Sequence, residues 1–222
     1  MVGLDGPVTE ISQGLARLGH EALGRVVTDL TRKKAEAALA EASRDLGGLD
    51  NVVIVTGVGA PGAEVVDLGG HEWAELCEDR LSGALVLTQA SYRHLSRSSH
   101  GRLVYVVPSV GMWGAPGYCI AGAVGEGIRA LAITTARTWG PSGITVNTVA
   151  CGPAALAGGA IDGDGRELLD RTVTHRAPPA LGGTDGDPES DIAGVIALFA
   201  SQTGRFVTGQ TLVADGGRFM PI

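Results

Sequence analysis

Aromatic residues and cysteines are scarce in this sequence, and no run of lysine or arginine occurs in it. Of the 222 residues, 4% are aromatic and three are cysteines, none of which forms a Cys-x-x-Cys pair. Isolated cysteines disfavour a disulfide scaffold and a zinc site, and they predict a reducing, cytoplasmic setting. No two histidines approach metal-ligand spacing, so no metal is expected. The formal net charge of −7 argues against nucleic acid or an anionic membrane as partner.

Long apolar runs are missing as well. No stretch reaches the roughly 18 residues that a membrane span needs, and residues 1–7 lack the layout of a signal peptide. Instead, short β-branched runs alternate with segments of helical period, which predicts an α/β fold with a mostly parallel sheet covered by helices on both faces. We expect a single domain over 1–222, in which residues 152–188 form a loop rich in glycine and proline.

The periodicity gives an approximate element order. Helices are expected at 8–18, 31–46, 71–95, 121–139 and 191–200, and strands at 25–29, 52–55, 103–107, 144–149 and 211–214. Thr31 is the expected N-cap of the second helix, which Gly47 and Gly48 end. The run Val52–Val55 is apolar throughout, which is typical of a strand buried on both faces.

Four motifs follow one another along the chain. They are Asp29-Leu30-Thr31, then Gly101 to Val104 with Ser109-Val110-Gly111, then Gly143 to Gly152, and finally Phe206 to Gly217, which reads FVTGQTLVADGG. In order and spacing they resemble the short-chain dehydrogenase/reductase family along nearly the whole chain. The resemblance implies a Rossmann-like, doubly wound sheet whose first strand, glycine-rich turn and helix hold a dinucleotide.

The start of the chain departs from that family pattern. Only 28 residues precede Asp29, whose motif lies near the adenine ring in family members, and Gly3 and Gly6 are followed by a proline. We interpret residues 1–7 as a solvated leader and expect the first βαβ unit of the family to be absent. Asp29 is then a remnant of a cofactor site, and no cofactor is predicted.

The catalytic positions depart from the pattern too. The family uses a tyrosine as proton donor, a lysine four residues later, a serine and an asparagine. Counting back from Gly143 to Asn147 puts Ala121 at the tyrosine position and Gly125 at the lysine position. Ser109 falls at the serine position and Arg80 at the asparagine position. Since only Ser109 remains, the resemblance predicts no nicotinamide-dependent hydride transfer by this chain alone.

Other residues are candidates for a different site. Tyr118 either substitutes for the missing tyrosine or fills the space of a lost cofactor. Arg80 either binds a carboxylate or phosphate or forms a surface ion pair on its helix. Cys151 is either a nucleophile or a small buried residue. His175 is the one histidine in the expected substrate-loop region.

These observations leave three functions open. The first is a non-catalytic subunit of a short-chain dehydrogenase/reductase oligomer, a homodimer, homotetramer or heteromer with a full-length paralogue through helices 71–95 and 121–139. Many small residues in the second helix favour such an interface. The second is a cofactor-independent cyclase, dehydratase or isomerase that uses Ser109 and Tyr118 on a small acyl or polyketide-like ligand. The third is an NAD(P)-dependent ketoreductase activity shared with a partner chain.

Overall fold

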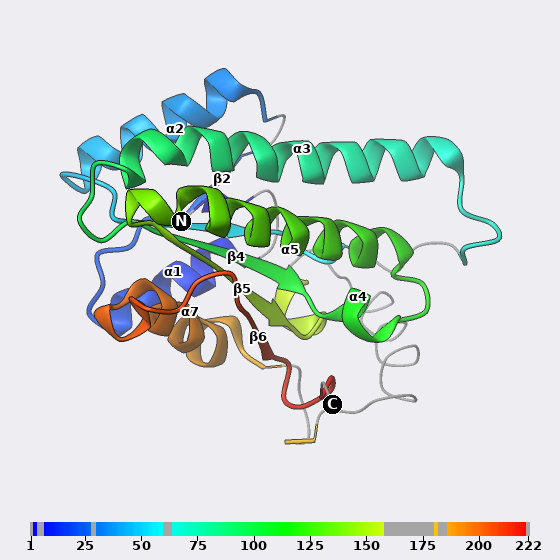
Figure 1. The fold of residues 1–222 in the computed structure, drawn as a ribbon. Helices are drawn as coiled ribbons and strands as arrows, with labels where there is room; N and C mark the ends of the chain where they lie inside the picture. Colours follow the sequence, from blue (N-terminus) through cyan, green and yellow to red (C-terminus); the bar gives the residue numbers. More distant parts are fainter. Residues whose placement is uncertain are drawn as a thin grey trace.

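The described part of the molecule is built around one six-stranded parallel sheet (Figure 1). The structure is a computed structural model that describes residues 2–3, 7–27, 30–59, 64–157, 180–181 and 186–220. The strand order is β2-β1-β3-β4-β5-β6, and every neighbouring pair is parallel. This confirms the Rossmann-like α/β class that the alternating pattern predicted.

The central strands are long and buried. They are β3 (Asn51–Val55), β4 (Arg102–Pro108) and β5 (Thr145–Cys151), followed at the edge by β6 (Thr211–Ala214). Strands β4 and β5 pair over seven residues each, and every residue in both is buried. Runs of β-branched residues suit this position because a parallel strand in the middle of a doubly wound sheet meets helices on both faces.

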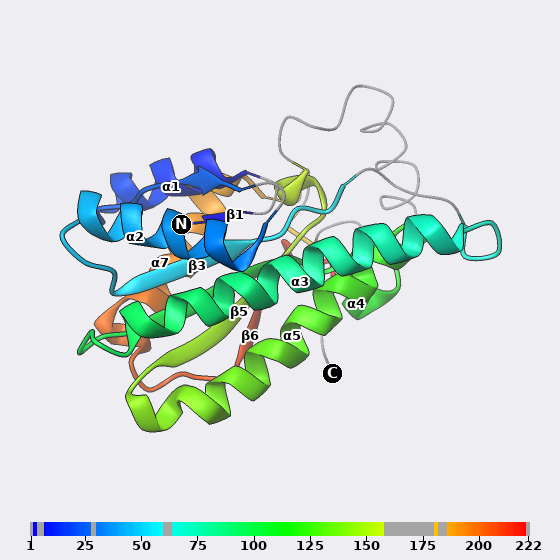
Figure 2. The same cartoon turned by 90° about the horizontal axis from the view of Figure 1, so that it is seen from above.

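Helices cover both faces of the sheet (Figures 1 and 2). One face carries α2 (Arg32–Asp45), α3 (Gly70–Leu95) and α5 (Cys119–Trp139), and the other carries α1 (Val8–Arg17) and α7 (Ala193–Ala200). Each face has its own apolar cluster: Leu39, Leu87 and Ile128 contribute to the first, and Ile11 and Ile196 to the second. Two separate cores on the two faces are the expected outcome of this layer order.

Short elements complete the described chain. They are α4 (Val110–Trp113), the 3-10 turns η1 (Gly140–Ser142), η2 (Ala154–Leu156) and η6 (Gln202–Gly204), and the π-helical turn η5 (Pro188–Ile192). The helix expected to start at residue 191 is therefore preceded by a π-helical turn, whose N-cap Asp187 accepts hydrogen bonds from the backbone of Glu189 and Ser190. Thr31 is the N-cap of α2, as predicted, and its Oγ1 accepts from Lys34 N.

The N-terminus corrects one part of the prediction. Val2–Gly3 form strand β1, which pairs with β2 (Arg25–Val26) on one side and with Ile54 and Val55 of β3 on the other. Val2 and Gly3 thus belong to the sheet and not to a solvated leader, and β1, α1 and β2 are present where the sequence predicted that the first βαβ unit was absent. The prediction missed it because a two-residue strand carries no detectable periodicity.

Helix α5 combines length with an apolar composition more than any other helix of the described chain. Together with the turn that follows it, residues 119–142 are long and apolar enough to cross a membrane, yet half of that apolar window is buried within the molecule. The burial comes from packing on β4, β5, α3 and α4. Its glycines allow this packing, because a Cβ at Gly127 would lie 2.8 Å from a Leu81 methyl and one at Gly122 would lie 3.1 Å from the Gly111 Cα. The small residues of α5 therefore serve contacts inside the chain.

Candidate active site

Polar contacts from the C-terminal motif fix the start of β6 beside the amino-terminal half of β5. Asn147 in β5 donates to the Val207 carbonyl (2.8 Å) and accepts from Gln210 N (3.1 Å), while Thr208 accepts from Val146 N (3.0 Å). These contacts bring β6 beside β5 and explain physically why the Val-Asn and Val-Thr-Gly-Gln motifs occur together. The motifs that carried the resemblance thus act mainly in building the sheet.

Asp215 fixes the turn that follows β6. Its side chain is 1% exposed and accepts backbone hydrogen bonds from Gly217, Arg218 and Phe219 at 3.0–3.2 Å. Gly216 and Gly217 both have a positive φ, which glycine adopts at little cost. A buried carboxylate with three N–H donors is well satisfied, and it fixes the turn that closes the carboxyl edge of the sheet.

Ser109 follows directly on β4 and is fully buried. Its backbone N–H donates to the Cys151 carbonyl at 2.7 Å, which joins the ends of β4 and β5. Its Oγ has no hydrogen-bond partner among the described residues. An unpaired buried hydroxyl costs about 1–3 kcal/mol, so this group is well suited to meet a ligand oxygen at the carboxyl edge, where ligands bind in open α/β sheets.

Tyr118 and Ala121 lie in one small apolar cluster at this edge. The Tyr118 ring is 3% exposed and packs with Ala121, Val58 and Val110, the residue that follows Ser109. The structure therefore brings Tyr118 into the neighbourhood of the family tyrosine position, one helical turn before Ala121. This packing agrees with both expectations for Tyr118, since a substitute phenol and a space-filling ring would both be buried here.

Gly125, at the lysine position of the family, packs closely against the backbone at the end of β4. A Cβ on Gly125 would lie 3.3 Å from the Pro108 carbonyl oxygen at the end of β4. Helix α5 thus approaches β4 more closely than a side chain at this position would easily permit. A tyrosine proton donor in this chain would work without the lysine that the family places four residues later, with a phenol whose ordinary pKa is near 10.

Arg80 holds the loop after β3. Its Nη1 donates to the Gly57 carbonyl at 3.3 Å, and a Cβ on Gly59, whose φ is +69°, would meet Nη2 at 3.2 Å. The arginine at the family asparagine position therefore contacts the turn that approaches a cofactor in the family. Thr56, at the start of this turn, is 1% exposed and its Oγ1 has no partner among the described residues. Thr56 was not among the predicted site residues, although a hydroxyl directly after a buried strand was a usable signal in the sequence.

The structure favours the packing interpretation of Cys151. The thiol is fully buried at the end of β5, and this burial, followed by the nearby charge of Asp215, raises its pKa far above the ordinary range of a thiol. A thiol held in its protonated form is a poor nucleophile. Burial also raises the pKa of Cys77 in α3. Asp29 and His175, two further residues of the sequence analysis, lie outside the described residues.

The N-terminal crossover offers a place for a dinucleotide. Strand β1 ends at Gly3 and α1 begins at Val8, after an N-cap, Pro7, that makes no side-chain capping bond. The first N–H groups of a helix without such a cap are available to an anion, and the N-terminus of the helix that follows the first strand is where this fold holds a pyrophosphate. Together with the unpaired hydroxyls of Ser109 and Thr56 at the same edge, these residues fit a nicotinamide dinucleotide.

Comparison with known proteins agrees with this geometry. Residues 5–218 match a family model described as enoyl-(acyl carrier protein) reductase. The short-chain dehydrogenase/reductase eriH of Hericium erinaceus is 32% identical over 213 residues, which are 95% of this chain and 81% of that protein. The chain therefore belongs to the short-chain dehydrogenase/reductase family.

Two further comparisons bear on activity. The 3-oxoacyl-[acyl-carrier-protein] reductase FabG of Vibrio cholerae is 30% identical over 206 residues, 91% of this chain and 80% of that protein. The crystal structure of a dehydrogenase/reductase from Sinorhizobium meliloti 1021 has a TM-score of 0.67 at 28% identity and covers 88% of this chain and 75% of that one.

These findings overturn the expectation of a non-catalytic partner subunit. The matched relatives are named as reductases and dehydrogenases over nearly the whole chain, and nothing in the comparisons indicates a degenerate subunit. The expectation also relied on the loss of the first crossover, and β1–α1–β2 is present. Of the alternatives, ketoreductase chemistry agrees best with the relatives.

Proposed function

We propose that this protein is an oxidoreductase that interconverts a ketone and a secondary alcohol with a nicotinamide dinucleotide. The observation that carries the proposal is the Ser109 hydroxyl, buried and unpaired at the carboxyl end of β4 in a chain of this family. A small acyl or polyketide-like ketone is the proposed substrate class. The relative FabG, a 3-oxoacyl-[acyl-carrier-protein] reductase, supports a β-keto acyl group in particular.

Each residue has a defined part in this proposal. Ser109 Oγ–H donates a hydrogen bond to the carbonyl oxygen of the substrate, which stabilises the negative charge that develops there. Tyr118, whose ring lies in the neighbouring cluster, is the proton donor to the same oxygen. The N-terminus of α1 holds the pyrophosphate. A nicotinamide dinucleotide bound there would supply or accept the hydride.

The proposal is tested by turnover with a simple ketone thioester such as acetoacetyl-N-acetylcysteamine and NADPH or NADH. Ser109→Ala is expected to lower kcat/KM by a factor of about 100, as removal of one oxyanion donor does. Ser91→Ala is the matched control, because Ser91 is equally buried but donates to Leu87 within α3. Equal turnover of the Ser109 variant and the parent would refute the role of Ser109.

We further propose that the protein self-associates through α3 and α5, within a cytoplasmic setting. These helices lie side by side on one face of the sheet (Figure 2). They carry four large apolar side chains that are 40–44% exposed: Trp73, Leu85, Tyr92 and Ile133. A heteromer with a full-length paralogue would use the same surface.

Charge placed on this surface tests the association. Leu85→Glu is expected to shift a dimer or tetramer to monomer in sedimentation, because a carboxylate cannot be buried there without a partner. Leu198→Glu, on α7 at the other face and also 43% exposed, is the control. An unchanged mass for Leu85→Glu would rule out this interface.

A further inference from the structure

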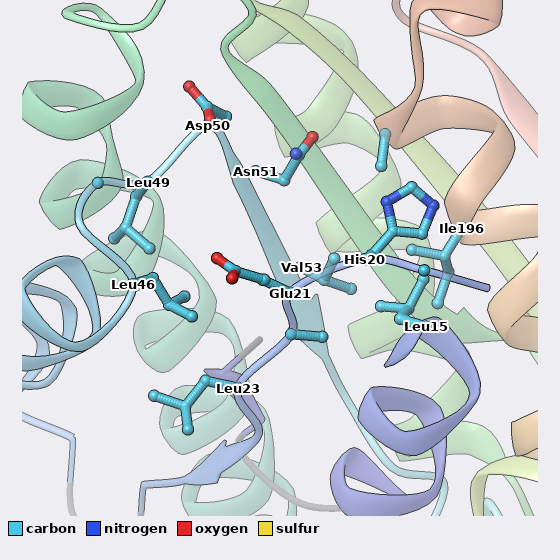
Figure 3. Close-up of a pocket in the computed structure, with 14 residues that line it drawn as sticks. Leu15, His20, Glu21, Leu23, Leu46, Leu49, Asp50, Asn51, Val53 and Ile196 are labelled. Carbon is cyan, nitrogen blue, oxygen red and sulfur yellow. The ribbon is translucent and has the colours of Figure 1, made fainter. Parts of the chain in front are cut away.

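The first residues of the three central strands form a polar row at the amino end of the sheet. Asn51, Arg102 and Thr145 begin β3, β4 and β5, and the register pairs Arg102 with Asn51 on one side and with Thr145 on the other. Figure 3 shows Asp50 and Asn51 at this end of β3. The row lies at the opposite edge of the sheet from Ser109, which follows the carboxyl end of β4.

Arg102 and Thr145 share the face of the sheet that α1 and α7 cover. In β4, Leu103 belongs to the apolar cluster of the other face and Val104 to the cluster beneath α1 and α7. Because side chains alternate along a strand, Arg102 lies on the same face as Val104. Val146 belongs to the first cluster, so Thr145 lies on this face too. The two residues are therefore neighbours on strands that run about 4.8 Å apart.

Both side chains are buried and have an unpaired polar atom. Arg102 is 4% exposed and Thr145 is 8% exposed. Arg102 Nη1 donates to the Gly101 carbonyl at 2.9 Å, whereas neither Arg102 Nε nor Thr145 Oγ1 has a hydrogen-bond partner in the described part of the chain. Buried polar groups are nearly always hydrogen-bonded. Two adjacent donors without a protein acceptor therefore mark a position for a small acceptor between them.

The charge of Arg102 is not balanced by the protein. No carboxylate of the described residues forms an ion pair with it. Asp50, whose backbone carbonyl accepts from Arg102 N, binds Ser98 Oγ through its carboxylate. Burial lowers the pKa of Arg102, but an arginine stays protonated in a protein. A buried cation without a counter-charge is strongly unfavourable. A water molecule would satisfy the hydrogen bonds and leave the charge, whereas an anion satisfies both.

We propose that Arg102 and Thr145 bind a monovalent anion of the size of chloride, which accepts hydrogen bonds from Arg102 Nε–H and Thr145 Oγ1–H and links the amino ends of β4 and β5. A position between two neighbouring strands, next to atoms shielded from solvent, suits a single ion better than an organic acid. Strand β3 separates this row from β1, so the site does not depend on the N-terminal strand. The proposal does not rest on the proposed oxidoreductase function.

The test compares thermal unfolding of the full chain in sodium chloride and in sodium gluconate, at pH 7 and equal ionic strength. The gluconate ion is too large for the site. With chloride about tenfold above its dissociation constant, the difference in Tm between the two salts is expected to be about 3–6 °C larger for the parent than for Arg102→Met. Arg205→Met, at an exposed arginine, is the control and should behave as the parent. The same difference in the parent and in Arg102→Met would overturn the proposal.

A second arm tests the hydroxyl and locates the ion. Thr145→Val keeps the shape of the side chain and is expected to weaken chloride about tenfold, while Thr148→Val, at a buried threonine of the same strand that faces the other layer, leaves chloride affinity unchanged. Crystals of the parent chain grown in sodium bromide are expected to show an anomalous scattering peak in contact with Arg102 Nε and Thr145 Oγ1. No bromide at this position, in a concentration that saturates the effect on Tm, would refute the site without reference to any variant.

Discussion

The two halves of the sheet differ in how completely they are built. Strands β4 and β5 pair over seven residues and are buried throughout, whereas β1 and β2 pair over two residues and Val26 in β2 is 56% exposed. The longer half contains Ser109 and three of the four family motifs, and the shorter half contains helix α1, whose N-terminus is proposed to hold the dinucleotide. We therefore expect β4 and β5 to contribute most to the stability of the fold, and the region of β1 and α1 to contribute to cofactor binding.

The sharpest test of this contrast compares one core position with one in the short half. Leu103→Ala in β4 removes a fully buried side chain and is expected to lower the free energy of unfolding by about 3 kcal/mol. Val26→Ala in β2 is expected to change it by less than about 0.5 kcal/mol. Urea titrations followed by circular dichroism measure both. Similar losses at the two positions would show that β2 is as integral to the core as β4.

The closing turn after β6 gives the next largest effect. Asp215→Ala removes a buried carboxylate that accepts from three backbone N–H groups, of which only that of Arg218 keeps a second acceptor, the backbone carbonyl of residue 215, so we expect a loss of about 3 kcal/mol in unfolding free energy. Asp187→Ala, an acidic residue at an exposed cap, is the control, with an expected loss of about 1 kcal/mol. A smaller loss at Asp215 than at Asp187 would contradict its structural role.

Two helical glycines test how α1 is attached to the rest. A Cβ on Gly14 would clash with the Glu189 carbonyl oxygen, so Gly14→Ala is expected to destabilise by about 1–2 kcal/mol despite better helix propensity. Gly194→Ala in α7 meets nothing within 4 Å and is expected to stabilise by about 0.5–1 kcal/mol. Thermal unfolding of both variants distinguishes them, and stabilisation by both would show that α1 is loosely attached.

The smallest expected effect is a pH dependence at η5. The backbone N–H of Ser190, then the Ser190 hydroxyl and the Glu189 N–H, hold the pKa of Asp187 below its ordinary value. Because the folded pKa is lowered, this contribution is present at neutral pH and is lost as the pH falls below about 4. Asp187→Asn should therefore differ from the parent in urea midpoint at pH 7 and much less at pH 3. An equal difference at both pH values would exclude the carboxylate charge as the cause.

The sequence predicted the parts of the fold that repeat a clear pattern. Thr31 as a cap, the apolar run of β3 and the C-terminal motif were all recognisable, because capping chemistry and buried strands leave strong local signals. Strand β1 was missed because pairing on both sides, a tertiary property, makes Val2–Gly3 a strand. The same holds for the packing of Gly125 on Pro108, which no local pattern reveals.

The candidate site was predictable only in outline. The sequence placed Ser109 after a strand, but its burial and unpaired hydroxyl depend on how β4 and β5 end together. Spacing in the sequence could not distinguish a catalytic Tyr118 from a space-filling one, because both place an aromatic ring at the start of α5. The prediction of a non-catalytic subunit was wrong because Ala121 and Gly125, at the tyrosine and lysine positions of the family, were taken to mean that the chain has no catalytic activity.

The most direct test of the proposed activity is transfer of deuterium from the reduced nicotinamide ring to a ketone substrate by this chain alone. With NADPH or NADH deuterated at both C4 positions and acetoacetyl-N-acetylcysteamine, the account predicts a 3-hydroxy product with deuterium on its carbinol carbon, formed by the parent chain and about 100-fold more slowly by Ser109→Ala. A product without deuterium, or no alcohol with either dinucleotide, would contradict it.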